Sequence, residues 1–290
     1  MYNEIFIIIA LLCIYILYVN IFLITVKNKK KVIDYNNYES FNDNIIASQN
    51  IIEQQNTPLV IKELPSVINK IPLLVVSLDR ATERKEYINK VLHNHEFSYF
   101  KAVDGKNLLE DEVILKSKYI SNGTQLKNGQ IGCYLSHIKI WIDIEKSQDI
   151  VHLILEDDIV LKYNIHKILN IINKIDFNDY DIIFLGHCFE SKGELKQEIL
   201  DESAYFNLYK SYTPLCTHAY LITKNGAKKA IDHLNSIYNT ENHIDQAIDN
   251  VISIMVGRGI LKSLSFHDTL INQPWQEPVN TLNLGCYTQQ

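Results

Sequence analysis

The sequence predicts an α/β domain built on a mainly parallel central sheet with helices on both faces. The first observation is a set of short apolar runs, typical of buried strands, at residues 71–78, 151–155, 181–186 and 218–223. The second is that helical stretches lie between these runs, and strands that alternate with helices form parallel sheets. The third is the low content of Gly (10) and Pro (6), which excludes a fibrous or low-complexity chain.

In chain order, the run 71–78 is followed by a charged helical stretch, residues 81–95, and then by the strand-like segment 97–103. That segment ends in Asp104-Gly105, a turn dipeptide. Residues 130–146 have helical periodicity with apolar positions on two opposite sides, which predicts a buried helix.

The apolar strand 151–155 ends abruptly at an acidic triplet, Glu156-Asp157-Asp158. The later strands are each followed by a turn or a helix, and residues 226–234 and 243–255 are predicted helices. In open sheets of this kind ligands bind at the carboxyl ends of the strands, so polar residues at those ends are the first candidates for chemistry.

The 290 residues carry 28 basic and 34 acidic side chains, for a formal net charge of −6 and a pI near 5.9. Nucleic-acid binding needs a basic surface that neutralises phosphates, so this balance argues against a nucleic-acid partner. Five Cys in a chain of this length exclude a disulfide scaffold. Only three basic residues are Arg, and two of them, Arg80 and Arg84, follow the first predicted strand.

The amino-terminal end contains an uncharged apolar segment, residues 5–26, which as a helix would span about 33 Å and so cross a hydrocarbon core of roughly 30 Å. The leader lacks Lys and Arg, and no small-residue cleavage pattern follows, which favours a retained anchor over a cleaved signal peptide. We predict a single-pass membrane protein with an anchor over 1–27, a stalk or linker over 28–70, and a catalytic domain over 71–290.

The side of the membrane stays open. A Lys cluster, residues 27–31, follows the apolar segment, and the positive-inside rule would keep this end in the cytosol. Asn122-Gly123-Thr124 is an acceptor pattern for N-glycosylation, and a glycan there would place the domain in a lumen instead.

Three charged residues, Asp79, Arg80 and Arg84, leave the first strand at its carboxyl end. Arg80 and Arg84 are four residues apart, so they share one face of the following helix. A guanidinium binds phosphate or carboxylate with two parallel hydrogen bonds, which Lys cannot do. The pair favours an anion site, and an ion pair within the helix or a solvated face is an equal alternative.

The acidic triplet concentrates negative charge at the end of an apolar strand, which is costly unless a cation binds. Alternate residues of an extended segment share a side, so Glu156 and Asp158 are expected to point together. Two carboxylates on one side suit Mg²⁺ or Mn²⁺, which in turn holds a diphosphate. The alternative is an Asp-rich turn that caps the next helix.

Other polar residues allow two interpretations. His137, in the buried helix, is slightly favoured as a hydrogen-bonded core histidine. Asp245 stands at a predicted helix start, where an acid is ordinary. The sequence has no phosphate loop, dinucleotide fingerprint, zinc-protease motif or nucleophile elbow, which removes the commonest kinase, dehydrogenase, protease and hydrolase interpretations.

Taken in order, seven segments resemble the family 25 glycosyltransferases, a group that includes lipooligosaccharide galactosyltransferases of bacteria and collagen hydroxylysine galactosyltransferases. The segments are VVSLDRATER, FKAVDG, LKNGQIGCYLSHIKIW, LILEDDIVL, DIIFLG, HAYLITKNGAKKAI and IDQAI. The resemblance covers residues 71–273. It implies a GT-A-like nucleotide-diphospho-sugar transferase fold and an inverting transfer of a hexose from a UDP-sugar, with Mn²⁺ or Mg²⁺.

The resemblance also implies roles for single residues. Those expected to line the donor pocket, close its floor, or face the sugar and phosphates are Asp79, Arg80, Arg84, Asp104, Gly105, Gly132, Ser136 and His137. The first interpretation of His137 is thereby reversed.

In the same way, Glu156 and Asp158 would hold the metal. Asp157 and Asp245 are the candidate catalytic acids, with Asp245 as a supporting acid or the base that takes the acceptor's proton. Many members of the family carry an acid where this chain has Gln246, which leaves the base open.

The predicted function is transfer of galactose or glucose from a UDP-sugar to a hydroxyl of a glycan or hydroxylated protein acceptor, in a single displacement. One alternative is a catalytically inactive, membrane-tethered nucleotide-sugar-binding protein, which would bind UDP with Mn²⁺ without turnover. Another is a metal-dependent phosphohydrolase, which would release phosphate without sugar specificity.

Overall fold

A computed structural model of the chain describes residues 71–202, 204–238 and 245–274, which all belong to one compact unit, Val67–Gln290. The predicted anchor (1–27) and linker (28–70) lie outside these residues. Within the described ranges, no helix is long and apolar enough to cross a membrane.

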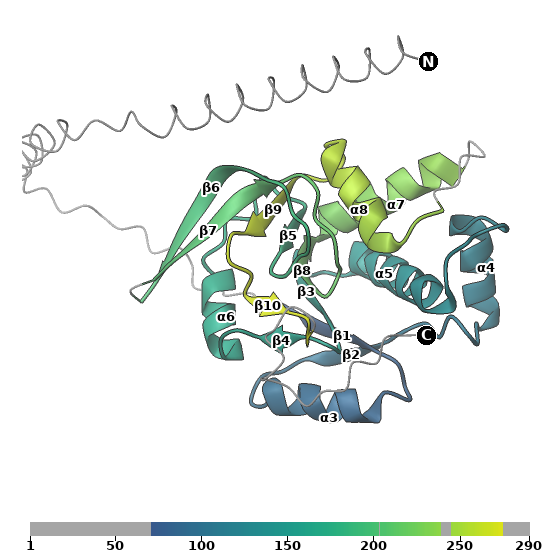
Figure 1. Cartoon of the computed structure of the whole chain (residues 1–290), viewed down its shortest axis with the longest axis horizontal. Helices are drawn as coiled ribbons and strands as arrows, with labels where there is room; N and C mark the ends of the chain where they lie inside the picture. Colours follow the sequence, from purple (N-terminus) through teal and green to yellow (C-terminus); the bar gives the residue numbers. More distant parts are fainter. Residues whose placement is uncertain (1–70, 203, 239–244, 275–290) are drawn as a thin grey trace, which may run out of the picture. The chain divides into compact units, whose positions relative to one another are not determined.

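Strands and helices alternate along most of the chain (Figure 1). The strands are β1 (Leu73–Ser77), β2 (Ser98–Lys101), β3 (Val151–Glu156), β4 (Val160–Leu161), β5 (Ile182–Phe184), β6 (Lys192–Asp201), β7 (Ala204–Ser211), β8 (Ala219–Thr223), β9 (Ser263–Phe266) and β10 (Ile271–Asn272). The helices are α3 (Thr82–Val91), α4 (Glu110–Tyr119), α5 (Asn128–Lys146), α6 (Ile165–Ile172), α7 (Lys224–Tyr238) and α8 (Ile248–Gly257).

The central sheet has eight strands in the order β2-β1-β3-β8-β5-β9-β7-β6, and it is mixed. The prediction of a mainly parallel sheet is therefore wrong. β8 runs antiparallel to both of its neighbours, β3 and β5. The reason is the β6–β7 hairpin: no crossover helix separates β5 from β8, and a parallel return requires such a crossover.

The sheet lies between two helical layers because successive strand residues point to opposite faces. On one face, residues such as Ile154 and Tyr220 pack into a core with α5, α7 and α8. On the other, residues such as Leu153 and Leu221 pack with α3 and α6. The prediction of helices on both faces is confirmed, and Figure 1 shows the two layers.

The elements predicted from apolar runs and helical periodicity are present, although their ends are shifted. The shift matters most for the last helix, which was predicted over residues 243–255. α8 begins at Ile248, so Asp245 and Gln246 precede the helix and do not open it. Ala247 is the extended N-cap residue, and Asp249 supplies the acid of the first turn. Seven elements escaped prediction, namely α4, α6, β4, β6, β7, β9 and β10.

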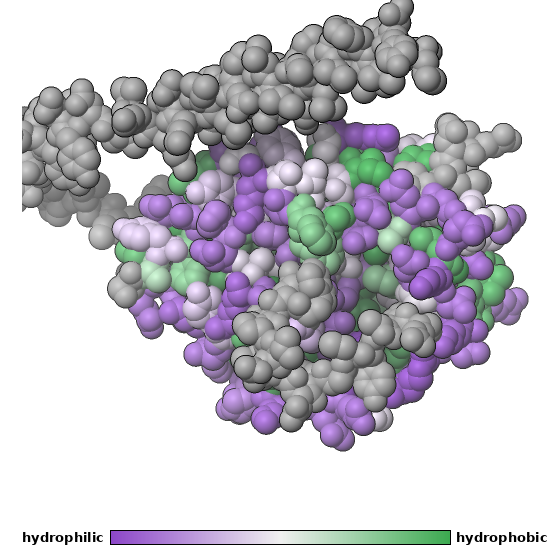
Figure 2. Space-filling view, in the orientation of Figure 1, coloured by the Kyte–Doolittle hydropathy of each residue, from purple (hydrophilic) through white to green (hydrophobic). Residues whose placement is uncertain are grey.

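Most of the face shown in Figure 2 is hydrophilic, with hydrophobic residues in scattered patches. This is the surface expected of a unit whose apolar side chains fill two internal cores.

A buried histidine in β3 predicts a pH dependence of stability. His152 is 5% exposed, and its Nε2 lies 3.3 Å from Ser147 Oγ. Burial lowers the pKa of His152, although Asp149 opposes this shift. Below about pH 6.5 the unfolded chain takes up a proton at this position before the folded chain does, so the free energy of unfolding falls as the pH drops toward the folded pKa. Above that pH the group contributes no dependence.

We expect the loss of stability between about pH 7.5 and about pH 5.5 to be smaller by about 1 kcal/mol in the His152→Gln variant than in the parent. Urea unfolding at the two pH values measures it. The control is His93→Gln, at an exposed position, which should lose as much as the parent. An equal loss in all three proteins would contradict the assignment.

Candidate functional site

A cavity of about 1010 Å³ lies at the carboxyl ends of β1 and β3. Its walls come from the β1–α3 connection, the loop after β2, the first turns of α5 and the end of β3. The residues predicted from the sequence that border it are Arg80, Arg84, Asp104, Gly105, Gly132, Ser136, His137, Glu156 and Asp157. Positions far apart in the sequence thus meet at one edge of the sheet.

Asp157 is held between β1 and α3. One carboxylate oxygen accepts a hydrogen bond from Ser77 Oγ (2.7 Å), and the other accepts one from Arg84 Nη1 (2.7 Å). The same guanidinium nitrogen lies 3.9 Å from Asp158. Burial alone would lower the pKa of Arg84, but the acidic triplet raises it. Arg84 is therefore a fixed positive charge against the acidic edge of the cavity.

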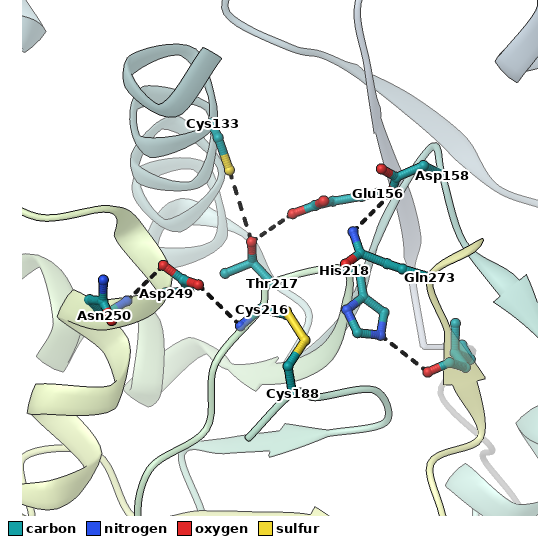
Figure 3. Close-up of a disulfide and its surroundings, with 11 residues drawn as sticks. Cys133, Glu156, Asp158, Cys188, Cys216, Thr217, His218, Asp249, Asn250 and Gln273 are labelled. Atoms are coloured by element: carbon teal, nitrogen blue, oxygen red, sulfur yellow. Dashed lines mark hydrogen bonds between the residues drawn. A yellow bond between two sulfur atoms is a disulfide. The ribbon is translucent and has the colours of Figure 1, made fainter. Parts of the chain in front are cut away.

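Glu156, the last residue of β3, is held from two other elements. Its Oε1 accepts a hydrogen bond from Thr217 Oγ1 (2.6 Å), which Figure 3 shows. The same oxygen lies 3.4 Å from His137 Nε2. Burial alone would raise the pKa of Glu156, but the hydrogen bonds from His137 and Thr217 lower it. The carboxylate is therefore charged at neutral pH.

The tautomer of His137 follows from its other neighbour. Trp141 Nε1 donates to Tyr220 Oη (3.1 Å), so the tyrosine hydroxyl can in turn donate to His137 Nδ1 (2.8 Å). The ring proton of His137 is then on Nε2, facing Glu156. His137 is fully buried with both nitrogens bonded, which fits the core-histidine interpretation, although the residue also borders the cavity. Its role toward a donor stays a prediction.

Asp158, the third residue of the triplet, follows Asp157 but is not among the residues that line the large cavity. Its Oδ1 accepts a hydrogen bond from Gln273 Nε2 (3.2 Å), as Figure 3 shows. Burial and the negative charge of Glu156 raise the pKa of Asp158 to about 6. A bound cation would offset the repulsion from Glu156 that raises the pKa of Asp158. Oxygen donors of this kind fit Mg²⁺ or Mn²⁺, so the residues present suit the predicted metal.

A different group, Cys133, His137 and Glu156, has ligand atoms within 4.8 Å of one another. Burial raises the pKa of the Cys133 thiol well above its usual value, so the group stays protonated. Both nitrogens of His137 are engaged in hydrogen bonds, with Tyr220 and with Glu156. We therefore interpret this group as a hydrogen-bonded network in which only the Glu156 carboxylate could bind a metal.

Two glycines let the loop after β2 pack against the start of α5. A Cβ on Gly105 would lie 1.8 Å from the Asn128 carbonyl oxygen, and one on Gly132 would lie 2.5 Å from that of Val103. Ser136 fastens the same contact, because its hydroxyl accepts from Val103 N (2.8 Å) and donates to Gly132 O (2.7 Å). These residues shape the wall; direct contact with a donor stays a prediction.

Asp79, Arg80 and Asp104 lie further out. Asp79 is exposed and pairs with Lys101 (2.8 Å), and the hydrogen bond from Lys101 lowers its pKa. It borders a smaller neighbouring cavity of about 210 Å³ and not the large one. Arg80 donates to both carboxylate oxygens of Asp104. This bidentate pair ties the β1–α3 connection to the loop after β2.

Asp245 is not brought to the acidic triplet. It is exposed and accepts hydrogen bonds from the Thr124 hydroxyl and from Gln125 N (3.1 Å). Gln125 directly precedes Leu126, which lines the cavity. Asp245 is thus attached to the rim, on the α5 side.

Sequence reasoning missed several residues of this region. Thr217 reaches Glu156 because β8 runs antiparallel, so its amino end meets the carboxyl end of β3. Gln273 follows β10, an element too short for any periodicity to mark. The Cys188–Cys216 disulfide joins two loops, and the cysteine count gave no sign of this pairing.

Comparison with known proteins assigns most of the described domain to a protein family. Residues 70–252, more than half of the chain, match the family model described as "Glycosyltransferase family 25 (LPS biosynthesis protein)". Procollagen galactosyltransferase 1-A of Xenopus laevis is 26% identical over 212 residues, which cover 66% of this chain and 34% of that protein. A glycosyltransferase 25 family member of Drosophila melanogaster is 30% identical over 176 residues, 55% of this chain and 27% of that protein.

The chain spans about a third of the length of these relatives. Among solved structures, a glycosyltransferase involved in the glycosylation of the major capsid of PBCV-1 matches 70% of this chain and 94% of its own, with a TM-score of 0.36 and 14% identity. This likeness is too weak to support an argument.

Proposed function

Because the chain belongs to glycosyltransferase family 25, we propose that it transfers a hexose, galactose or glucose, from a UDP-sugar to a hydroxyl of a glycan or protein acceptor. The observation that carries the proposal is the cavity at the sheet edge, which is lined at the end of β3 by Glu156 and Asp157 of the acidic triplet. Galactose is supported by the procollagen galactosyltransferases among the relatives.

We propose that Glu156 and Asp158 hold Mn²⁺ or Mg²⁺ in this reaction. When bound, the ion would supply positive charge that stabilises the diphosphate as it leaves. The chain prepares these ligands itself: His137 and Thr217 keep Glu156 ionised and oriented, and Gln273 holds Asp158. Arg84 donates a hydrogen bond to Asp157 and so holds this part of the acidic triplet in place. Asp157 is therefore proposed as a positioning residue and not as the base.

The transfer is proposed to be an inverting single displacement. The acceptor oxygen forms a bond to the anomeric carbon, the bond from that carbon to the diphosphate oxygen breaks, and the acceptor's proton passes to a carboxylate. Both candidate acids have both carboxylate oxygens hydrogen-bonded within the protein. Asp157 is buried and paired with Arg84, whereas Asp245 is exposed at the rim, so we propose Asp245 as the base.

The test is a donor screen with the full chain. UDP release from a panel of UDP-hexoses is measured with and without Mn²⁺, in the presence of hydroxylated peptide or glycan acceptors. We expect release with one or two hexoses that depends on Mn²⁺. UDP binding without turnover over the whole panel would point to the inactive binding protein, and release of inorganic phosphate to a phosphohydrolase.

Replacement of the proposed base should separate binding from chemistry. In Asp245→Asn the retained amide oxygen still accepts from Gln125 N, so the rim keeps its shape, while the proton acceptor is lost. We expect kcat to fall about 100-fold or more with the donor KM nearly unchanged. Gln246→Ala, at the exposed neighbouring position, should leave both constants unchanged. An unchanged kcat in Asp245→Asn would exclude this residue as the base.

We further propose that residues 5–26 anchor the protein in a membrane as a single-pass segment, on the basis of their length and lack of charge. The side of the membrane is open to a direct test. Asn122 is exposed, so glycosylation at Asn122 in a eukaryotic expression host would report a lumenal domain. An unmodified Asn122, with a glycan on a tag before the apolar segment, would report the opposite orientation.

A further inference from the structure

Three potential metal ligands outside the acidic triplet lie close together, two of them buried and one half-buried. Ligand atoms of Cys188, Cys216 and His218 lie within 4.8 Å of one another, and the two cysteines form a disulfide. Cys188 follows β5, while Cys216 and His218 stand just before β8 (Figure 3). Neither the proposed transfer reaction nor the hard-cation site uses any of these three side chains.

His218 is the unusual member of the group. Its side chain is fully buried, and its Nε2 donates to the Ile271 carbonyl oxygen (3.2 Å). This bond places the ring proton on Nε2 and leaves a lone pair on Nδ1. Nδ1 has no hydrogen-bond partner in the part of the chain that the structure describes. A buried acceptor without a partner is costly, so an unused lone pair in the interior calls for a physical reason.

The surroundings hold the ring in this orientation. A Cβ on Gly186 would lie 2.0 Å from His218 Nε2 and 2.3 Å from the Ile271 carbonyl oxygen, so only glycine admits the imidazole here. Metal-binding histidines commonly donate their second ring nitrogen to a backbone carbonyl, which fixes the tautomer and the ring plane. His218 has this arrangement.

The two cysteines are held in place by backbone contacts as well as by their disulfide. Cys188 and Leu215 exchange two hydrogen bonds, Cys188 N to Leu215 O at 2.9 Å and Leu215 N to Cys188 O at 3.2 Å. Cys216 has a φ of +70°, an unfavourable conformation for a residue with a side chain, and its N–H donates to Asp249 (3.3 Å). Because these contacts do not depend on the disulfide, we expect them to keep the two sulfur atoms close to His218 after reduction.

We propose that the reduced protein binds Zn²⁺ through Cys188, Cys216 and His218, and that the disulfide is the oxidised form of the same site. Thiolate sulfur and imidazole nitrogen are the ligands that Zn²⁺ prefers, and three protein ligands leave a fourth position for water. The ion would use the lone pair on Nδ1 that the described structure leaves unpaired. This site differs in chemistry from the proposed Mn²⁺ or Mg²⁺ site, which offers carboxylate oxygen.

The two forms are related by a balanced exchange. Binding of Zn²⁺ releases the protons of the two thiols. Oxidation of the metal-bound form by a disulfide such as oxidised glutathione removes two electrons from the two thiolate sulfurs, forms the Cys188–Cys216 bond and releases the ion. The two glutathione thiolates take up two protons from solvent and become reduced glutathione. The occupancy of the site is thereby linked to the redox state of the compartment.

Co²⁺ serves as the spectroscopic probe of the site, and Zn²⁺ as its competitor. The full chain carries Cys13→Ser and Cys286→Ser, so that only Cys133, Cys188 and Cys216 remain, and it is reduced and freed of metal with a chelator. We expect one equivalent of Co²⁺ to produce thiolate charge-transfer absorption, and Zn²⁺ to abolish it. Oxidised glutathione should also abolish it, with release of two molecules of reduced glutathione.

Variants identify the ligands. His218→Gln retains an amide donor for Ile271 O but removes the Nδ1 lone pair, and we expect it to weaken metal affinity by roughly 100-fold. Cys188→Ser and Cys216→Ser should abolish the thiolate absorption. The matched control is Cys133→Ser, at the other cysteine of the described ranges, which should retain it in full. Asp158→Asn should also leave it unchanged, because that residue belongs to the hard-cation site.

Absence of thiolate absorption from the reduced protein at equimolar Co²⁺ would overturn the proposal. So would equal affinities in the parent and in His218→Gln. Circular dichroism of each variant shows whether it is folded, and His218→Gln keeps the test decisive if either cysteine variant unfolds. The outcome does not depend on transferase activity, so the two proposals fail separately.

Discussion

In the Asp158→Asn variant, Mn²⁺-dependent transfer from the UDP-sugar is expected to fall by about 1,000-fold or more, because a bound metal ion stabilises the leaving diphosphate by several kcal/mol. The amide has nearly the same shape as the carboxylate and can still meet Gln273, but it carries no charge. The substitution also removes the electrostatic repulsion between the carboxylates of Asp158 and Glu156, which a bound cation would offset. The fold is therefore expected to remain intact while the metal site is lost.

Two measurements separate this effect from damage elsewhere. Calorimetric titration with Mn²⁺ reports metal affinity without turnover, and it should weaken together with the transfer rate. Asp143→Asn, at an exposed position of α5, is the matched substitution and should change neither quantity. Full activity of Asp158→Asn at saturating donor would show that the metal, if one acts, is held by other residues.

The Gly105→Ala variant is expected to lose about 3 kcal/mol of stability, since the added methyl group has no space. Its Cβ would lie 1.8 Å from the Asn128 carbonyl oxygen and 2.8 Å from Gly132 N, and both are backbone atoms that side-chain rotation cannot move. Relief of the clash requires the loop after β2 to move away from the start of α5. Because these two segments form one wall of the cavity, donor affinity should fall as well.

Urea unfolding measures the stability change, and the donor KM measures the change in the wall. Gly123→Ala is the control, because a Cβ there would have no atom within 4 Å, and its stability should stay within about 0.5 kcal/mol of the parent. If Gly105→Ala proved as stable as Gly123→Ala, the close approach of loop and helix would not be a constraint on this fold.

Strong periodicity made much of this fold predictable. β1, β3, β5 and β8 are apolar runs in the sequence and nearly fully buried strands in the structure. β6 could not be found in this way, because the strand is mostly polar and pairs only with β7 at the edge of the sheet. The antiparallel direction of β8 could not be predicted either, because an apolar run gives no information about which way its strand points in the sheet.

The candidate site, like the fold, could be predicted from the sequence only in part. The rule that ligands bind at strand carboxyl ends pointed to the edge of the sheet where Arg84, Glu156 and Asp157 line one cavity. The rule could not find Thr217, which enters from the amino end of an antiparallel strand. It also could not separate Asp79 from Arg80, adjacent residues that differ in whether they reach the large cavity.

The position of β3 between β1 and β8 has a consequence for how the chain folds during synthesis. β1 is already available when β3 leaves the ribosome, but β8 begins only at Ala219, so one edge of β3 stays unpaired while the intervening segments are made. An apolar strand with a free edge is prone to self-association. Glu156 likewise lacks Thr217 until that late pairing occurs. Assembly of the acidic edge is thus among the last steps of folding, and nascent chains that stop short of β8 are the species most exposed to aggregation.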